Sequence, residues 1–302
     1  MKLPAALERV VHDDRVNFVL TNQIPRRLAT RLVGWFSRIE LPVVRDLSIA
    51  LFEAFAGDLR MHEAKKTRFA SLHDCFVREL KDGARPLAPD PSVLVSPCDG
   101  IVGAFGAIDD TELLQAKGSS YTLEELLCDS SAVGRYRGGS YVTLRLAPNM
   151  YHRFHAPCDC RLDGATYISG DTWNLNPPTL KRIARLYCRN ERVVVHARVD
   201  GCEEAVALVA VAAILVASVR LSFLAEPLTL SYRGPTFIPC AARYRKGEEL
   251  GYFHHGSTII VLATGGLAVC DHVRSGDIVR MGEPLLRRSG AARSSSASYV
   301  AI

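Results

Sequence analysis

The sequence contains no apolar run long enough to cross a bilayer as a helix. Its longest apolar stretch extends from Ala205 to Val219, whereas a spanning helix needs about 20 apolar residues. The valine and isoleucine content of this stretch favours a buried strand instead. The N-terminal sequence MKLPAALERVVHDD also lacks the apolar core of a cleavable signal peptide. We therefore expect neither a transmembrane helix nor a secretory leader.

Disulfide bonding and metal ligation have little support. The nine cysteines are odd in number, and without a leader they indicate reduced thiols and a cytosolic compartment. Cys158 and Cys160 form a C-x-C motif, but the sequence has no paired C-x-x-C motifs and no histidines at zinc-ligand spacing. We therefore predict no bound metal.

Charge is modest and mixed. The 302 residues are 48% hydrophobic and 23% charged, which is ordinary for a folded protein of one large domain or two smaller ones. The net charge of +5 is too small to indicate a nucleic-acid partner, although it suits an anionic surface if the charge is clustered.

The segment from residue 1 to about 65 is predicted to be helical. Apolar residues share one helical face at Leu28, Leu32, Trp35, Phe36 and Ile39. Arginines lie largely elsewhere on the same segment, at Arg26, Arg27, Arg31 and Arg38. A basic amphipathic helix with tryptophan is typical of a segment that lies in a membrane interface, and it equally fits a helix packed on the protein's own core. Further helices are expected from Val43 to Leu59 and from Asp74 to Leu80.

Beyond the proline-rich segment from Arg85 to Pro91, the pattern changes to short strands separated by Gly, Pro and Asp. This predicts an α+β fold, in which the helical segment precedes a mostly antiparallel core resembling a β-barrel or sandwich. One helix is expected within this core, from Thr179 to Tyr187. The predicted division is a helical segment at 1–65, a core at 66–288 and a flexible tail at 289–302.

Three short motifs contain residue types that are used in catalysis. Ser257 follows a glycine and precedes a strand, where its hydroxyl could attack the preceding carbonyl, although such turns are common. His152 and His155 lie in YHRFH and suit a base and a proton donor, or alternatively a metal pair or surface residues. Asp99 stands in a turn and either orients a histidine or only shapes the turn.

Together, the order Asp99, His152 and His155, Ser257, with these neighbours, resembles the phosphatidylserine decarboxylase family. The resemblance covers about Phe69 to Leu286, and more loosely the N-terminus. The matching stretches are LHDCFVRELKDGARPL, SPCDGIVG, LLQAKGSSYTLEELL, APNMYHRFHAPCDC, YISGDTWNLNPPTL, RNERVVV, VALVAVAAILVASV and KGEELGYFHHGSTII. Several of these stretches are long and specific, so chance explains them poorly.

The sequence departs from the family's pattern at three places. His255 replaces a usual leucine, Cys98 replaces an alanine, and Trp173-Asn174 replaces a more hydrophobic pair. His255 lies beside the implied cleavage site, where a second base would change the pH range of processing. None of the departures removes a residue of the implied catalytic set.

The resemblance implies a self-processing enzyme. Asp99, His155 and Ser257 would form a triad that cuts the chain between Gly256 and Ser257, and Ser257 would become a pyruvoyl cofactor. The amine of phosphatidylserine would form a Schiff base with this group and lose CO2, which yields phosphatidylethanolamine. His152 would return a proton to the product carbon.

The resemblance also implies partners. A large chain of residues 1–256 and a small chain of residues 257–302 would stay associated as a heterodimer, with further dimerisation left open. A lipid substrate favours the membrane-docking interpretation of the helical segment, since anionic phosphatidylserine attracts arginines. We therefore expect peripheral association with the cytoplasmic face of the cell membrane.

Three alternatives use the same residues differently. A serine hydrolase would keep its serine and remain one chain, but the sequence lacks the G-x-S-x-G elbow. A biotinyl or lipoyl carrier is suggested by residues 273–286 and by PCDGIVG, but no lysine occupies the expected turn. A related decarboxylase for a soluble amine would not need the basic amphipathic N-terminus.

Overall fold

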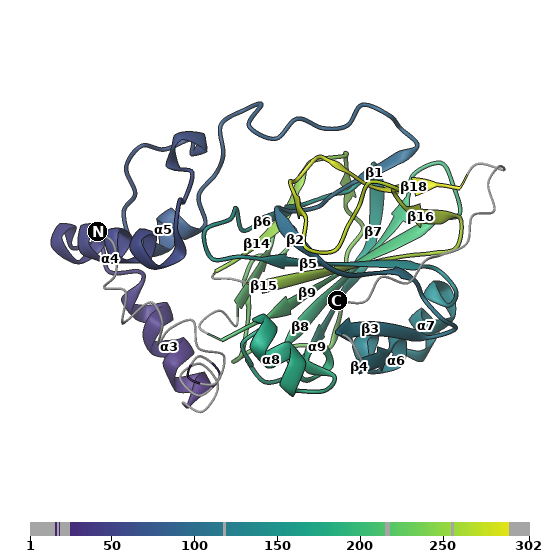
Figure 1. The fold of residues 1–302 in the computed structure, drawn as a ribbon, viewed down its shortest axis with the longest axis horizontal. Coiled ribbons are helices and arrows are strands. Elements are labelled where there is room, and N and C mark those ends of the chain that lie inside the picture. Colours follow the sequence, from purple (N-terminus) through teal and green to yellow (C-terminus); the bar gives the residue numbers. More distant parts are fainter. Residues whose placement is uncertain are drawn as a thin grey trace.

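Helices lie beside one end of a β-rich body (Figure 1). The computed structural model describes residues 16, 18, 25–116, 119–214, 218–254 and 257–289. The N-terminal helices within these ranges are α3 (Arg26–Phe36), α4 (Pro42–Ala56), the 3-10 helix η1 (Met61–Glu63) and α5 (Leu72–Phe76). The helix expected from Val43 to Leu59 is confirmed as α4. The helix expected from Asp74 to Leu80 overlaps α5 only at residues 74–76, and Leu80 instead forms an antiparallel bridge with Ala64.

The largest sheet has nine strands, and every pair of neighbouring strands in it is antiparallel. Its order is β12-β7-β8-β9-β15-β5-β2-β17, and β13 also pairs with β7. The strands are β2 (Gly100–Ala107), β5 (Ser140–Leu146), β7 (Cys160–Ile168), β8 (Arg192–Val199), β9 (Ala205–Ala212), β12 (Phe237–Pro239), β13 (Arg243–Tyr244), β15 (Ser257–Ala263) and β17 (Ile278–Val279).

The predicted α+β, mostly antiparallel fold is confirmed, but the barrel is wrong. Within the described part of the chain, the sheet ends at β12 and β17, which do not pair with each other. These end strands have only three and two residues. They offer too few backbone hydrogen bonds to close the sheet on itself.

Three smaller sheets surround the large one. One has the order β11-β10-β14-β6, the second β1-β18-β16, and β3 pairs with β4. Their strands are β1 (Val93–Val95), β3 (Glu112–Ala116), β4 (Ser119–Thr122), β6 (Arg153–His155), β10 (Ser218–Leu221), β11 (Leu228–Thr229), β14 (Glu249–Phe253), β16 (Leu267–Val269) and β18 (Pro284–Arg288). The remaining helices are α6 (Leu123–Leu127), α7 (Ser130–Tyr136), α8 (Pro177–Arg182) and α9 (Leu186–Arg189).

β15 is a central strand of the large sheet. All seven of its residues pair with β5 on one side and with β9 on the other. Its side chains from Thr258 to Ala263 are buried. The strand that begins at Ser257 is therefore held by two ladders of backbone hydrogen bonds and by the core.

The helical part is attached to the β-rich body through α3. The Arg26 guanidinium binds the Asp171 carboxylate, with Nη2 2.5 Å from Oδ2, and lies 3.8 Å over the Trp173 ring. Trp173 is one of the residues at which the sequence departs from the pattern of the family that it resembles. None of the helices in the described ranges is long and apolar enough to cross a membrane.

Candidate active site

β6 brings the sequence motifs together. The His155 amide donates to the Pro97 carbonyl at 2.8 Å, which places β6 against the turn that contains Asp99. On its other side β6 pairs with β14, and the Phe253 amide donates to the His152 carbonyl at 3.1 Å. β14 ends at Phe253, four residues before Ser257. The histidine motif thus lies between the aspartate turn and the segment that leads to the serine.

His155 is buried and held at both ring nitrogens. Its Nδ1 is 2.9 Å from the Gly247 carbonyl oxygen, which can only accept, so Nδ1 carries the proton. Nε2 is then the acceptor for the Tyr151 hydroxyl at 3.0 Å. Burial, together with the smaller effect of the Arg153 charge, lowers the pKa of His155 to about 4, although the hydrogen bond to Gly247 raises it. The imidazole is therefore neutral at physiological pH, as a general base must be.

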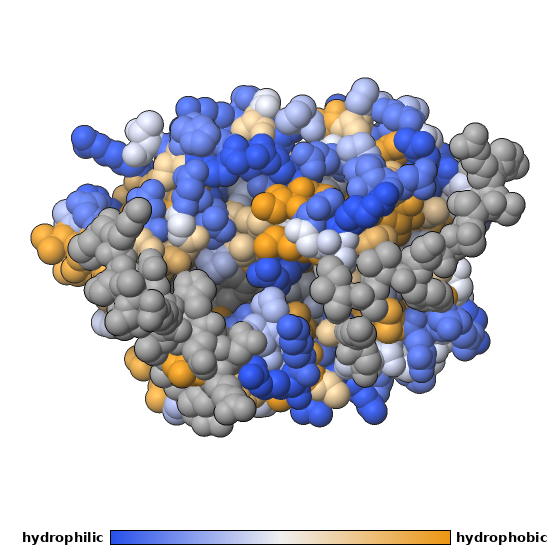
Figure 2. All heavy atoms as spheres, in the orientation of Figure 1, coloured by the Kyte–Doolittle hydropathy of each residue, from blue (hydrophilic) through white to orange (hydrophobic). Residues whose placement is uncertain are grey.

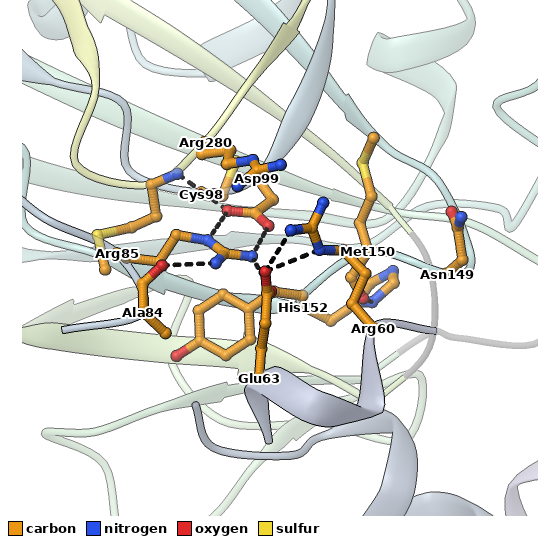
Figure 3. A network of polar contacts seen from close by, with 12 residues as sticks. Arg60, Glu63, Ala84, Arg85, Cys98, Asp99, Asn149, Met150, His152 and Arg280 are labelled. Atoms are coloured by element: carbon orange, nitrogen blue, oxygen red, sulfur yellow. Dashed lines mark hydrogen bonds and ion pairs between the residues drawn. The ribbon is translucent and has the colours of Figure 1, made fainter. Parts of the chain in front are cut away.

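Asp99 is bound by an arginine rather than by a histidine (Figure 3). Arg85 donates to both carboxylate oxygens, from Nε at 2.8 Å and from Nη2 at 2.6 Å, and the Met281 amide donates at 3.0 Å. Across the described ranges, the carboxylate makes no hydrogen bond to His155. The negative charge of Asp99 nevertheless raises the pKa of His155 against the larger effect of burial.

Arg85 also connects the helical part to the site. Its Nη2 lies 2.9 Å from Glu63 Oε2, and Glu63 in turn pairs with Arg60 (Figure 3). The Arg85 side chain is only 4% exposed, with Asp99 at 8% and Glu63 at 12%. Sequence reasoning missed Arg85, which stood out only as the first residue of the proline-rich segment.

His152 lies in an apolar setting. It is fully buried, and its ring centroid is 4.0 Å from that of Phe76 in α5. Its Nδ1 is 2.8 Å from the Met150 carbonyl oxygen, which assigns the Nδ1 proton. The carbonyl and the Phe76 ring together fix the orientation of the imidazole.

The cleavage site falls partly outside the described residues. His255, Gly256 and the side chain of Ser257 lie outside them, as does the predicted tail beyond Ser289. The Ser257 backbone pairs with Leu146 and Ala212. Thr258 is fully buried, and in the described part of the structure its Oγ1 has no hydrogen-bond partner. No group of three or more potential metal ligands occurs among the described side chains.

Comparison with known proteins identifies the family. The sequence profile described as phosphatidylserine decarboxylase matches residues 72–287. A phosphatidylserine decarboxylase proenzyme of Haemophilus influenzae is 34% identical over 275 residues, which cover 87% of this chain and 92% of that protein. Proteins of the same name are 35% identical in Dickeya dadantii, covering 90% and 92%, and 34% identical in Brevibacillus brevis, covering 88% and 95%. The chain belongs to the phosphatidylserine decarboxylase family.

Proposed function

We propose that this chain cuts itself before Ser257 and then converts phosphatidylserine to phosphatidylethanolamine and CO2. The observation that carries the proposal is the position of β6. It holds a neutral, buried His155 between the Asp99 turn and β14, which leads to Ser257. Family membership over the whole core supports the same assignment.

In the first stage the Tyr151 hydroxyl leaves Nε2 of His155, this nitrogen removes the hydroxyl proton of Ser257, and the serine oxygen attacks the Gly256 carbonyl carbon. The amide C–N bond breaks and an ester forms in its place. Elimination then releases the Gly256 carboxyl group and leaves a dehydroamino acid at position 257. One water hydrolyses it to a pyruvoyl group with loss of ammonia. Asp99 assists through its charge, whereas the Gly247 carbonyl holds the His155 tautomer.

The surroundings of residue 257 fit a pyruvoyl group. β15 is paired on both sides from residue 257 onward, so a new chain terminus there stays in place. The adjacent Thr258 hydroxyl is buried and, among the described residues, has no partner, so it is available to a carbonyl oxygen. When present, a pyruvoyl group accepts the electrons that are released as CO2 departs.

His152 is the proposed proton donor of the second stage. Its backbone is held beside Phe253, and its ring is fixed by the Met150 carbonyl and Phe76. Proton return to the product carbon needs an acid at a fixed place and without competing water. The fully buried imidazole of His152 is fixed in place and shielded from water.

The proposed product is a heterodimer of chains 1–256 and 257–302. The small chain contributes β15, β16, β17 and β18, so both chains share one core, and further dimerisation is left open. We assign residues 1–65 to membrane association, 66–288 to the catalytic core and 289–302 to a tail.

An intact mass spectrum under denaturing conditions tests self-processing. We expect two chains, one ending at Gly256 and one beginning at residue 257, the second lighter than its encoded sequence by one ammonia. The Ser257→Ala protein should remain a single chain. A wild-type protein that stays uncut after prolonged incubation would overturn the proposal and favour a serine hydrolase or an inactive relative.

The proposed membrane surface is formed by apolar side chains of α3 and α4. Twelve large apolar side chains are exposed among the described residues, and nine of them lie between residues 28 and 55. They are Leu28, Leu32, Trp35, Phe36, Leu41, Val43, Leu47, Leu51 and Phe55. Figure 2 shows apolar side chains at the end of the molecule where Figure 1 places α3 and α4. An apolar patch of this kind suits peripheral docking on the cytoplasmic face of the cell membrane.

Vesicle sedimentation tests this surface. Trp35 and Leu47 are 68% and 58% exposed, so replacing both with glutamine removes apolar contact without disturbing a core. Each side chain contributes up to about 1.5–3 kcal/mol on burial, so we expect at least a tenfold loss of binding to phosphatidylserine-containing vesicles. Ile278→Gln, at an exposed apolar residue of β17, should bind normally. Equal binding by all three proteins would contradict the assignment.

A further inference from the structure

A cavity lies between α3 and the sheet that contains β10 and β14. Its volume is about 150 Å³, and Arg31, Arg38, His73, Ser218 and His254 are among the residues that line it. His254 directly follows β14 and precedes Ser257 by three residues, so their Cα atoms are at most about 11 Å apart. The cavity therefore adjoins the proposed cleavage site without using any residue of the catalytic set.

The lining is rich in cationic and hydrogen-bonding groups. Arg38 Nη2 is 3.5 Å from His254 Nδ1, and that nitrogen is 3.2 Å from His73 Nε2. The two imidazoles stack with their ring centroids 4.8 Å apart. Among the residues that the structure describes, those lining the cavity include no aspartate or glutamate. Burial, and secondly the charge of Arg38, lowers the pKa of His73 to about 4. The guanidinium groups of Arg31 and Arg38 make the local potential positive, which favours an anion.

α3 links this cavity to the proposed membrane surface. Thr30 and Gly34 lie four residues apart on one face of α3 and line the cavity, and Arg38 lines it from the turn that follows the helix. Leu28, Leu32 and Trp35 lie on the other face and are more than half exposed. A single helix thus presents apolar side chains outward and a cationic cavity inward.

We propose that this cavity binds the phosphodiester of the substrate headgroup, an inference that rests on the function proposed above. In phosphatidylserine, one oxygen and two carbons separate the phosphorus from the amine. A phosphate beside Arg38 therefore leaves the amine close to residue 257, while the acyl chains extend toward the apolar face of α3. Guanidinium groups bind phosphate oxygens with charge-assisted hydrogen bonds.

The carboxylate of the substrate is a poorer occupant. It loses its charge as CO2 leaves, so an arginine bound to it would stabilise the ground state more than the transition state and would slow the reaction. The phosphodiester keeps its charge throughout. Binding the phosphodiester in this cavity therefore positions the substrate without raising the activation barrier for decarboxylation.

Calorimetric titration with glycerophosphoserine tests the site without catalysis. In a full-length Ser257→Ala background, Arg38→Gln should weaken binding about tenfold or more, since hydrogen bonds to charged groups are among the strongest. Arg68→Gln is the matched control, because Arg68 is exposed and does not line the cavity. Inorganic phosphate should bind more weakly than glycerophosphoserine. Equal affinity in the Arg38→Gln and control proteins would overturn the site, and phosphate binding as tight as glycerophosphoserine would overturn its assignment to the headgroup.

Kinetics with a short-chain phosphatidylserine, kept below its critical micelle concentration, remove the membrane from the comparison. Processed Arg38→Gln enzyme should show a KM raised about tenfold with a smaller change in kcat, and Arg68→Gln should match the wild type. A KM unchanged by Arg38→Gln would contradict the proposal. A wild-type chain that neither cuts itself nor releases CO2 would instead show that the underlying function is wrong.

Discussion

Replacing His155 with glutamine should leave almost all of the protein as an uncut chain. The substitution keeps a polar side chain near Gly247 and Tyr151 but removes the base that takes the Ser257 proton. Positioned general bases typically contribute a factor of about 10²–10⁴, so cleavage should slow by that amount. The fraction of cut chain, followed over time on a denaturing gel, measures the effect.

His152→Gln separates the two stages. We expect it to be cut as rapidly as the wild type and to lose most decarboxylation, because His152 serves only the second stage in our proposal. Thermal unfolding of both variants checks that the fold is intact, since both histidines are buried. Loss of cleavage in His152→Gln, or normal cleavage in His155→Gln, would reverse or remove the assigned roles.

Arg85→Met should produce the largest loss of stability. The substitution leaves the Asp99 and Glu63 carboxylates buried without the cation that now lies 2.6 Å and 2.9 Å from them. Removing one partner of a buried ion pair typically costs about 3–5 kcal/mol. Chemical denaturation of the uncut Ser257→Ala protein, with and without Arg85→Met, measures the difference in the free energy of unfolding.

Arg60→Gln is the control for this network. Arg60 pairs with the same Glu63, but its side chain is 40% exposed, so its loss should cost no more than about 1 kcal/mol. Similar losses in Arg60→Gln and Arg85→Met would show that burial does not set the strength of these contacts.

The sequence predicted the composition of the fold better than its connections. It placed buried strands in the apolar run from Ala205 to Val219, but the run divides into β9 of the large sheet and the start of β10 in another. Both parts of the run are apolar and strand-like, so hydrophobic periodicity does not reveal that they belong to different sheets. The helix expected from Thr179 to Tyr187 is instead two short helices, α8 and α9. They are separated at Arg185, whose φ of 54° is left-handed and cannot continue a helix.

The site shows a similar limit. The YHRFH motif and the Asp99 turn were recognisable because each is local in sequence. The hydrogen-bond partners of these residues could not be recognised from the sequence, because the tertiary structure determines which groups meet. Gly247 holds His155 through a backbone carbonyl, and a carbonyl contact has no side-chain signature in the sequence. His73 and His254 meet across 181 positions of sequence, and no pattern within either segment indicates that contact.

Because β15 is a central strand, a cut before Ser257 makes refolding after complete unfolding much harder than it is for the uncut chain. Before the cut, β15 finds its place between β5 and β9 as part of the same polymer, at a high effective concentration set by the connecting chain. After a cut before Ser257, the same strand belongs to a separate molecule, and its return becomes a bimolecular encounter that depends on dilution. The stability of the cut enzyme would then be kinetic: it would remain folded because it unfolds slowly, and it would not refold readily once unfolded. Only the uncut chain contains β5, β9 and β15 in one molecule and can form the large sheet without an encounter between two chains.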